Sequence, residues 1–291
     1  MGTSSSNGGP GNDTPLVPTW LDQDNPGAPS LPMGENPTGG DQQGSPAPFV
    51  PTPAVPTPAV ASHRFTSARN NFSRFIASGG RDRKSLGRAV SQYVSNASGG
   101  AHNASRRMGS SRVAGSRLLG FMSNAVTSGV REALKSLDLE KLAGRPIEDI
   151  FLGLVDYICP DSGTVDQAIA REAFIETISD LAENGITDLD SLDASQMETV
   201  FELYATHAIE ARLYNDIGSK AIVLPPDIRQ VELLQQQIYD FIRRGVSDAL
   251  ASARNTIQSM TPDALRGFVD NIYEQTFTIL QHLGRMEARL K

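Results

Sequence analysis

The sequence of 291 residues contains one cysteine and one tryptophan. The single cysteine, Cys159, excludes an intramolecular disulfide framework and a cysteine-based zinc site, and it favours a reducing, intracellular compartment. No apolar run reaches the ~18 to 20 residues that span a bilayer. The N-terminus lacks both the basic region and the apolar region of a secretory signal. We therefore expect a soluble, cytoplasmic protein.

Residues 1–63 lack lysine and arginine, and 13 of the 18 prolines fall before residue 59. Such a segment buries too little apolar surface to offset the entropy lost on ordering. Residues 50–60 repeat Val-Pro-Thr-Pro-Ala twice, which favours an extended polyproline spacer. The sequence thus predicts a disordered tail over residues 1–63.

Charge divides the rest of the chain into two regions. Residues 64–135 hold 13 basic and two acidic residues, for a net charge of +11, whereas residues 136–291 hold 13 basic and 26 acidic residues, for a net charge of −13. We interpret the first region as a basic helical arm and the second as an acidic helical domain. Either the arm meets a polyanion, or it packs on the acidic surface of its own chain.

The pattern of apolar residues from residue 65 onward has the period of helices. Glycine pairs at 79–80 and 99–100 end the first two expected helices, and a small-residue helix is expected over 101–128. No segment alternates long enough to form a strand, so the predicted fold is all-α, a multi-helix bundle-like domain. In the acidic region, helices are expected from Pro146 to Pro160, from a capping box at Thr164-Val165-Asp166-Gln167, from about Asp193 to Asp216, from Pro225-Pro226-Asp227 to Met260, and from Thr261-Pro262 to the C-terminus.

Most catalytic signatures are absent, including the phosphate loop, the dinucleotide-binding glycine motif and His-Glu-x-x-His. The strongest constellation lies on one expected helix, which carries Glu198, Glu202, His207, Glu210 and Asp216. A carboxylate-bridged metal site needs Glu-x-x-His on paired helices, and this chain has no second copy. Because His207 is in line with Val200, Leu203 and Ala211, we expect a partly buried core histidine. No catalytic residue, metal or cofactor is predicted, and Cys159 is expected to be a small buried side chain.

Four arginines in the small-residue region suggest an alternative function for the chain. At helical spacing they are able to neutralise phosphates, although no recognised nucleic-acid fold accompanies them. The alternative is therefore a nucleic-acid-binding helical module that acts through its basic arm, at Arg106, Arg107, Arg112 and Arg117.

The N-terminus offers a third kind of chemistry. Gly2 permits removal of Met1, and a free glycine amine is an unhindered nucleophile with a pKa near ~7.7 to 8.0. Gly2 with Ser6 also matches the eukaryotic myristoylation pattern, and an inert flexible end is the simpler interpretation. Further along, an apolar motif with Leu16, Trp20 and Leu21 is typical of a docking segment, unless it folds back on its own body.

Seven segments of the chain resemble the QatB family, the B component of a bacterial four-protein anti-phage system that also contains an ATPase, a QueC-like enzyme and a TatD-like nuclease. These segments are Met1-Gly2-Thr3-Ser4-Ser5-Ser6-Asn7-Gly8-Gly9-Pro10, Pro15-Leu16-Val17-Pro18-Thr19-Trp20-Leu21, Asn71-Phe72-Ser73-Arg74-Phe75, Ser78-Gly79-Gly80, Arg106-Arg107-Met108-Gly109-Ser110-Ser111-Arg112, Phe151-Leu152-Gly153-Leu154-Val155-Asp156-Tyr157 and Tyr204-Ala205-Thr206-His207-Ala208-Ile209-Glu210-Ala211.

The resemblance implies a non-enzymatic subunit that binds the QueC-like enzyme, with the ATPase and the TatD-like nuclease as further partners. It also implies that a deazaguanine-type group is joined by an amide bond to the amine of Gly2. The segment entering the active site of the enzyme would then be Thr3, Ser4, Ser5, Ser6, Asn7, Gly8 and Gly9.

Overall fold

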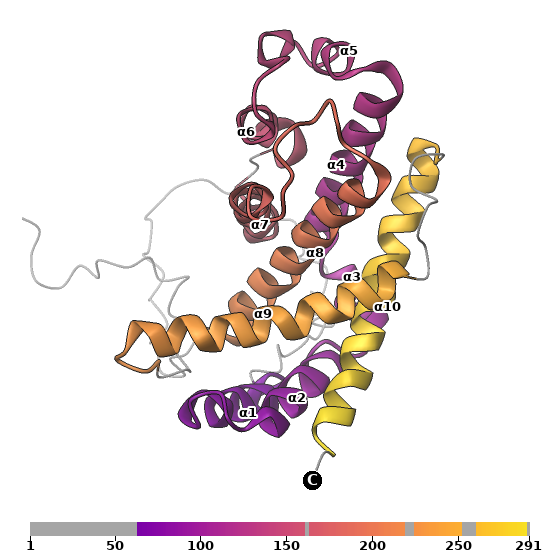
Figure 1. Ribbon diagram of the computed structural model, residues 1–291. Helices are drawn as coiled ribbons and strands as arrows, with labels where there is room; N and C mark the ends of the chain where they lie inside the picture. Colours follow the sequence, from indigo (N-terminus) through magenta and orange to yellow (C-terminus); the bar gives the residue numbers. More distant parts are fainter. Residues whose placement is uncertain (1–62, 161–162, 219–223, 252–259, 290–291) are drawn as a thin grey trace, which may run out of the picture. The chain divides into compact units, whose positions relative to one another are not determined.

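The structure is a computed structural model that describes residues 63–160, 163–218, 224–251 and 260–289 (Figure 1). These ranges contain ten α-helices and no β-strand, so the predicted all-α class is confirmed for the described part of the chain. Within it, no helix is long and apolar enough to cross a membrane. The predicted tail lies outside the described residues, apart from His63.

The basic region forms five helices: α1 (Thr66–Ala77), α2 (Arg83–Gln92), α3 (Ala101–Arg106), α4 (Gly109–Ser128) and α5 (Val130–Lys135). Gly79 and Gly100 follow α1 and α2 with positive φ angles, a conformation that glycine adopts without steric cost. The predicted ends of the first two helices are therefore confirmed. A single π-turn, Tyr93–Ala97, extends α2.

The prediction of a single helix over residues 101–128 was wrong. Residues 101–128 form two helices, α3 and α4, because the chain leaves the helical path at Met108, whose φ and ψ are −93° and 27°. Met108 is buried, with 2% of its surface exposed. The break thus places an apolar side chain in the core. Because this depends on packing against other helices, the periodicity of apolar residues in the sequence does not predict it.

The acidic region forms five more helices: α6 (Ile147–Ile158), α7 (Val165–Leu181), α8 (Ala194–Ile217), α9 (Ile228–Ala251) and α10 (Pro262–Glu287). Thr261 caps α10 by accepting a hydrogen bond from the backbone of Ala264, and Pro262 is the first helical residue. Pro146 precedes α6 as its N-cap and is not its first helical residue. Its ψ of 150° is extended, so the helix begins one residue later than expected.

Two further helix ends differ from expectation. The reciprocal capping box lies at Asp193 and Gln196, at the start of α8. At α7 the Thr164 hydroxyl oxygen accepts from the Gln167 backbone, whereas the Gln167 side chain accepts from that hydroxyl. The long helix expected to reach Met260 is described only to Ala251, and Met260 is not helical; residues 252–259 lie outside the described residues.

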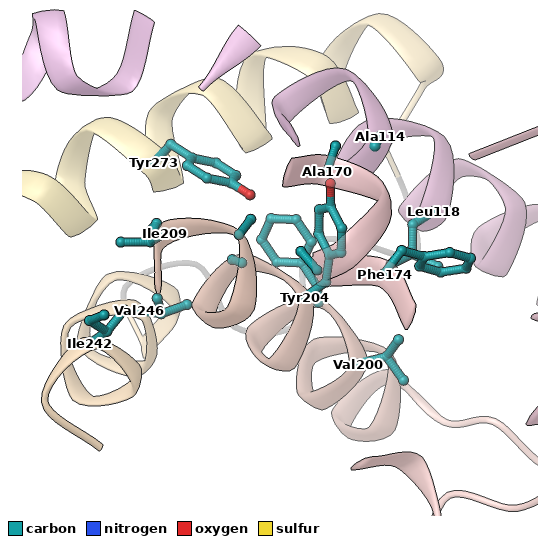
Figure 2. Packing of buried hydrophobic residues seen from close by; sticks show 14 of the residues in the cluster. Ala114, Leu118, Ala170, Phe174, Val200, Tyr204, Ile209, Ile242, Val246 and Tyr273 are labelled. Atoms are coloured by element: carbon teal, nitrogen blue, oxygen red, sulfur yellow. The ribbon is translucent and has the colours of Figure 1, made fainter. Parts of the chain in front are cut away.

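The centre of the core is α8, which packs on α4, α7 and α9. Figure 2 shows Tyr204 of α8 among buried side chains from these helices, near Phe174 and Ala114. The rings of Tyr204 and Phe174 meet edge to face, with 6.4 Å between centroids. The Tyr204 hydroxyl donates to the Ser111 carbonyl at 3.0 Å, so this buried polar atom has its partner.

The last helix, α10, joins the two charge regions because it packs on α2, α3, α4 and α9. It crosses α2 where two glycines face each other. A Cβ atom at Gly87 would lie 2.7 Å from the carbonyl oxygen of Gly284. This crossing therefore depends on the absence of side chains, and it brings the surfaces of α2 and α10 close together (Figure 1).

Candidate functional site

The predicted acceptor Gly2, the segment 3–9 and the motif residues Leu16, Trp20 and Leu21 all lie outside the described residues. The sites that the structure describes are the four arginines of the basic arm and the constellation around His207. These two sets lie in different surroundings, and each is built from residues of several helices.

Arg107 follows α3 and forms an ion pair with Asp216 near the end of α8. Its guanidinium nitrogen lies 2.9 Å from both carboxylate oxygens of Asp216, and the Tyr93 hydroxyl donates to the same carboxylate at 2.9 Å. Arg69 of α1 adds a bond from Nε to the Ile217 carbonyl at 2.6 Å. The Asp216 side chain is only 7% exposed. A carboxylate of the acidic region is thus the buried partner of the basic arm.

The other predicted arginines are placed separately. Arg112 forms an ion pair with Asp270 of α10 at 2.7 Å. The Arg117 guanidinium lies 3.4 Å from the carbonyl oxygens of Tyr157 and Ile158, at the end of α6. Arg106 is exposed. Arg107 and Arg112 therefore neutralise carboxylates of their own chain, which agrees with the interpretation that the basic arm packs on its own acidic surface. A nucleic-acid role for the four arginines stays a prediction.

A cavity of about 540 Å³ lies between α7, α8 and α9. Among the described residues that line this cavity, only His207 and Arg243 have basic side chains. Acidic side chains outnumber them: Glu172, Glu176 and Asp180 from α7, Glu183 from the turn after it, Glu210 from α8 and Glu232 from α9. The cavity therefore has an acidic wall.

His207 lies at this wall with Asp180 as its partner. Its Nε2 is 2.8 Å from a carboxylate oxygen of Asp180, and its Nδ1 is 4.0 Å from Glu210. The imidazole ring also packs on the ring of Tyr239, with 5.0 Å between centroids. The expected partial burial is confirmed, since the His207 side chain is 12% exposed. The expected apolar core setting was wrong, because carboxylates and a phenol surround the ring.

Glu210 is the most perturbed acid of the cavity. Burial raises its pKa from 4.5 to about 7, and the carboxylates of Glu176 and Asp180 contribute in the same direction. Glu202 lies apart from this group, because it accepts from Arg243 Nε at 2.7 Å. Around neutral pH, Glu210 is thus present in both its neutral and its charged form.

Four residues of the predicted constellation divide among separate contacts. His207 and Glu210 share the cavity, Glu202 pairs with Arg243, and Asp216 pairs with Arg107. No group of three metal-ligating side chains suited to a metal ion occurs in the described ranges. Cys159 is buried as expected, and burial raises the pKa of its thiol to about 12.

Sequence reasoning missed the residues that α7 contributes to the cavity. Glu172, Glu176 and Asp180 recur at intervals of four residues, which places them on one face of the helix, and Glu183 follows in the turn after α7. The same spacing is typical of an ordinary solvated face, so the pattern alone does not indicate a cavity. An acidic cavity of this kind attracts cations and excludes anions.

A comparison with family models matches residues 99–280 to the family described as QatB, the Qat anti-phage system associated protein QatB. This range covers more than half of the chain and includes most of the described helices. No curated protein and no solved structure matches the chain.

Proposed function

This chain belongs to the QatB family, and from that membership we infer that it acts in anti-phage defence. In this role it is a non-enzymatic subunit that binds a QueC-like enzyme and presents Gly2 for modification. The amine of Gly2 attacks an activated carboxyl group on a deazaguanine-type molecule. An amide bond forms, the activating group leaves with the electron pair of the broken bond, and the amine releases a proton. The ATPase and the TatD-like nuclease of the same system are further partners.

The observation that carries the proposal is the start of the sequence. Gly2 follows Met1, and residues 3–9 are small and uncharged, so the segment fits a narrow cleft without placing a charge in it. The proline-rich stretch at 50–60 separates this end from α1. A spacer of that composition keeps two parts of a chain apart, which lets the helical part bind the enzyme while the amine reaches its active site.

Mass spectrometry of the N-terminal peptide tests the proposal, with the protein expressed alone and together with its genomic neighbours. We expect a mass gain on the peptide beginning at Gly2 only when the QueC-like enzyme is present. An added residue before Gly2 blocks this gain and abolishes defence, while Gly34→Ala, outside both the segment 3–9 and the Leu16–Leu21 motif, serves as a matched control that leaves the amine in place. Full defence from a chain with a blocked N-terminus contradicts the proposal.

A further inference from the structure

A group of basic side chains lies around the start of α2 and the end of α10, away from the arginines predicted from sequence. Arg81 just before α2 and Lys84 and Arg88 within it recur at intervals of three and four residues. Arg285 lies in the last turn of α10, and Arg289 follows four positions later, just beyond the helix. None of these five side chains forms an ion pair or a side-chain hydrogen bond with any residue in the described ranges. We name these five residues the α2/α10 patch.

The glycine crossing brings the two rows together. Because Gly87 and Gly284 lack side chains, α2 and α10 approach closely, and residues of both helices line a common cavity of about 200 Å³. Arg88 contributes from α2, Arg285 from the last turn of α10 and Arg289 from just beyond it. Three arginines therefore line one small depression.

The acidic groups near the patch do not cancel its charge. Glu287 of α10 accepts from Arg83 Nε at 2.9 Å, so this pair is neutral as a unit. Asp82 interacts with Lys84 and Arg88, which contribute to lowering its pKa. Its carboxylate also accepts from the backbone and the hydroxyl of Ser85, where it caps α2. Six cations against two carboxylates leave a net charge of +4.

We propose that the α2/α10 patch binds the phosphate backbone of a nucleic acid. Four of its five cations are arginines, and the guanidinium fork donates two parallel hydrogen bonds to phosphate oxygens. Four of the five cations are exposed and Lys84 is half-buried, and cations arranged in two rows match a polymer of regularly spaced phosphates. Base recognition is not part of the proposal, since no aromatic side chain lines the depression. The proposal goes beyond the role of Gly2 and does not depend on it.

Binding of the full-length chain to a random duplex DNA, measured by fluorescence anisotropy at several salt concentrations, tests the proposal. With five phosphate contacts, affinity falls about 500-fold between 50 and 200 mM salt, because the logarithm of affinity decreases by about 0.9 per contact for each tenfold rise in salt. Arg285→Gln with Arg289→Gln leaves three contacts, so the loss over the same range decreases to about 40-fold.

A matched control carries the same change of net charge elsewhere. Arg131→Gln with Arg266→Gln removes two exposed arginines outside the patch and leaves the 500-fold loss unchanged. Arg266 precedes Arg285 by 19 positions on α10, which corresponds to about 28 Å along the helix. Circular dichroism confirms that both double variants fold. Gly2→Ala also leaves DNA affinity unchanged, so failure of the Gly2 proposal and failure of this one are separate results.

Three results overturn the proposal. No binding at 50 mM salt shows that phosphate backbone is not the partner. An equal reduction of the salt effect in both double variants shows that net charge acts without a localised patch. Competition by a mononucleotide at the same phosphate concentration assigns the depression to a single free phosphate and not to a polymer.

Discussion

Replacing Glu210 with glutamine should remove a pH-dependent loss of stability. In the unfolded chain this carboxyl releases its proton near pH 4.5, whereas burial in the acidic cavity raises its pKa to about 7 in the folded chain. Between these values the folded state binds more protons than the unfolded state. The contribution of Glu210 to the free energy of unfolding therefore decreases as pH rises through this window.

The magnitude follows from the two pKa values. Their difference of about 2.5 corresponds to about 3 kcal/mol in the free energy of unfolding, as an order of magnitude. The amide of Glu210→Gln does not ionise, so it avoids this cost. We expect the variant and the native chain to have similar stability near pH 4.5, and the variant to be more stable by up to about 3 kcal/mol at pH 8.

Urea unfolding followed by circular dichroism, repeated between pH 4.5 and pH 8, measures this difference. Glu183→Gln is the matched control, because Glu183 lines the same cavity but has an exposed side chain; its stability difference from the native chain should vary little with pH. A constant difference across the window for Glu210→Gln, or a variant that is less stable at pH 8, would refute the reasoning.

Three further substitutions or treatments address the buried contacts. Asp216→Asn removes the charge that pairs with Arg107, and leaving a partly buried cation uncompensated should destabilise the fold by about 3–5 kcal/mol in urea unfolding; a loss below 1 kcal/mol would show that the pair is effectively solvated. Tyr204→Phe removes the hydroxyl that donates to the Ser111 carbonyl and should cost about 0.5–1.5 kcal/mol, visible as a lower Tm. An unchanged Tm would mean that this hydrogen bond contributes nothing to stability. Cys159 should react with a thiol reagent only after denaturation, because its thiol is buried and its pKa is raised to about 12; rapid labelling of the folded chain would contradict its burial.

Helix ends were predictable wherever a local signal sets them. The glycines at 79–80 and the Thr261-Pro262 pair act on their own backbone, so the sequence around them suffices. The break at Met108 was not predictable, because its cause is the burial of one side chain against distant helices. The same limit applies to Pro146, where one dihedral angle decides between the N-cap and the first helical position.

The candidate site was predictable only in part, because sequence patterns report one helix at a time. His207 and Glu210 were singled out correctly as neighbours on α8. Their most important partner, Asp180, comes from α7, and no spacing rule relates the two helices. The pairing of Arg107 with Asp216 also spans 109 positions. Charge totals left open whether the basic arm meets a polyanion or its own acidic surface, and they did not indicate which residues meet.

The contact of α2 with α10 has a consequence for the order of events during protein synthesis. Arg83 and Glu287 are 204 positions apart, so at ~5–20 residues per second the ribosome needs roughly 10–40 s after making the first to deliver the second. During that interval the apolar face of α2 lacks its covering helix and is a target for chaperones. The N-terminal glycine leaves the ribosome well before any docking surface that includes α10 exists. Translation itself therefore separates the appearance of the proposed acceptor from the completion of the surface proposed to carry it.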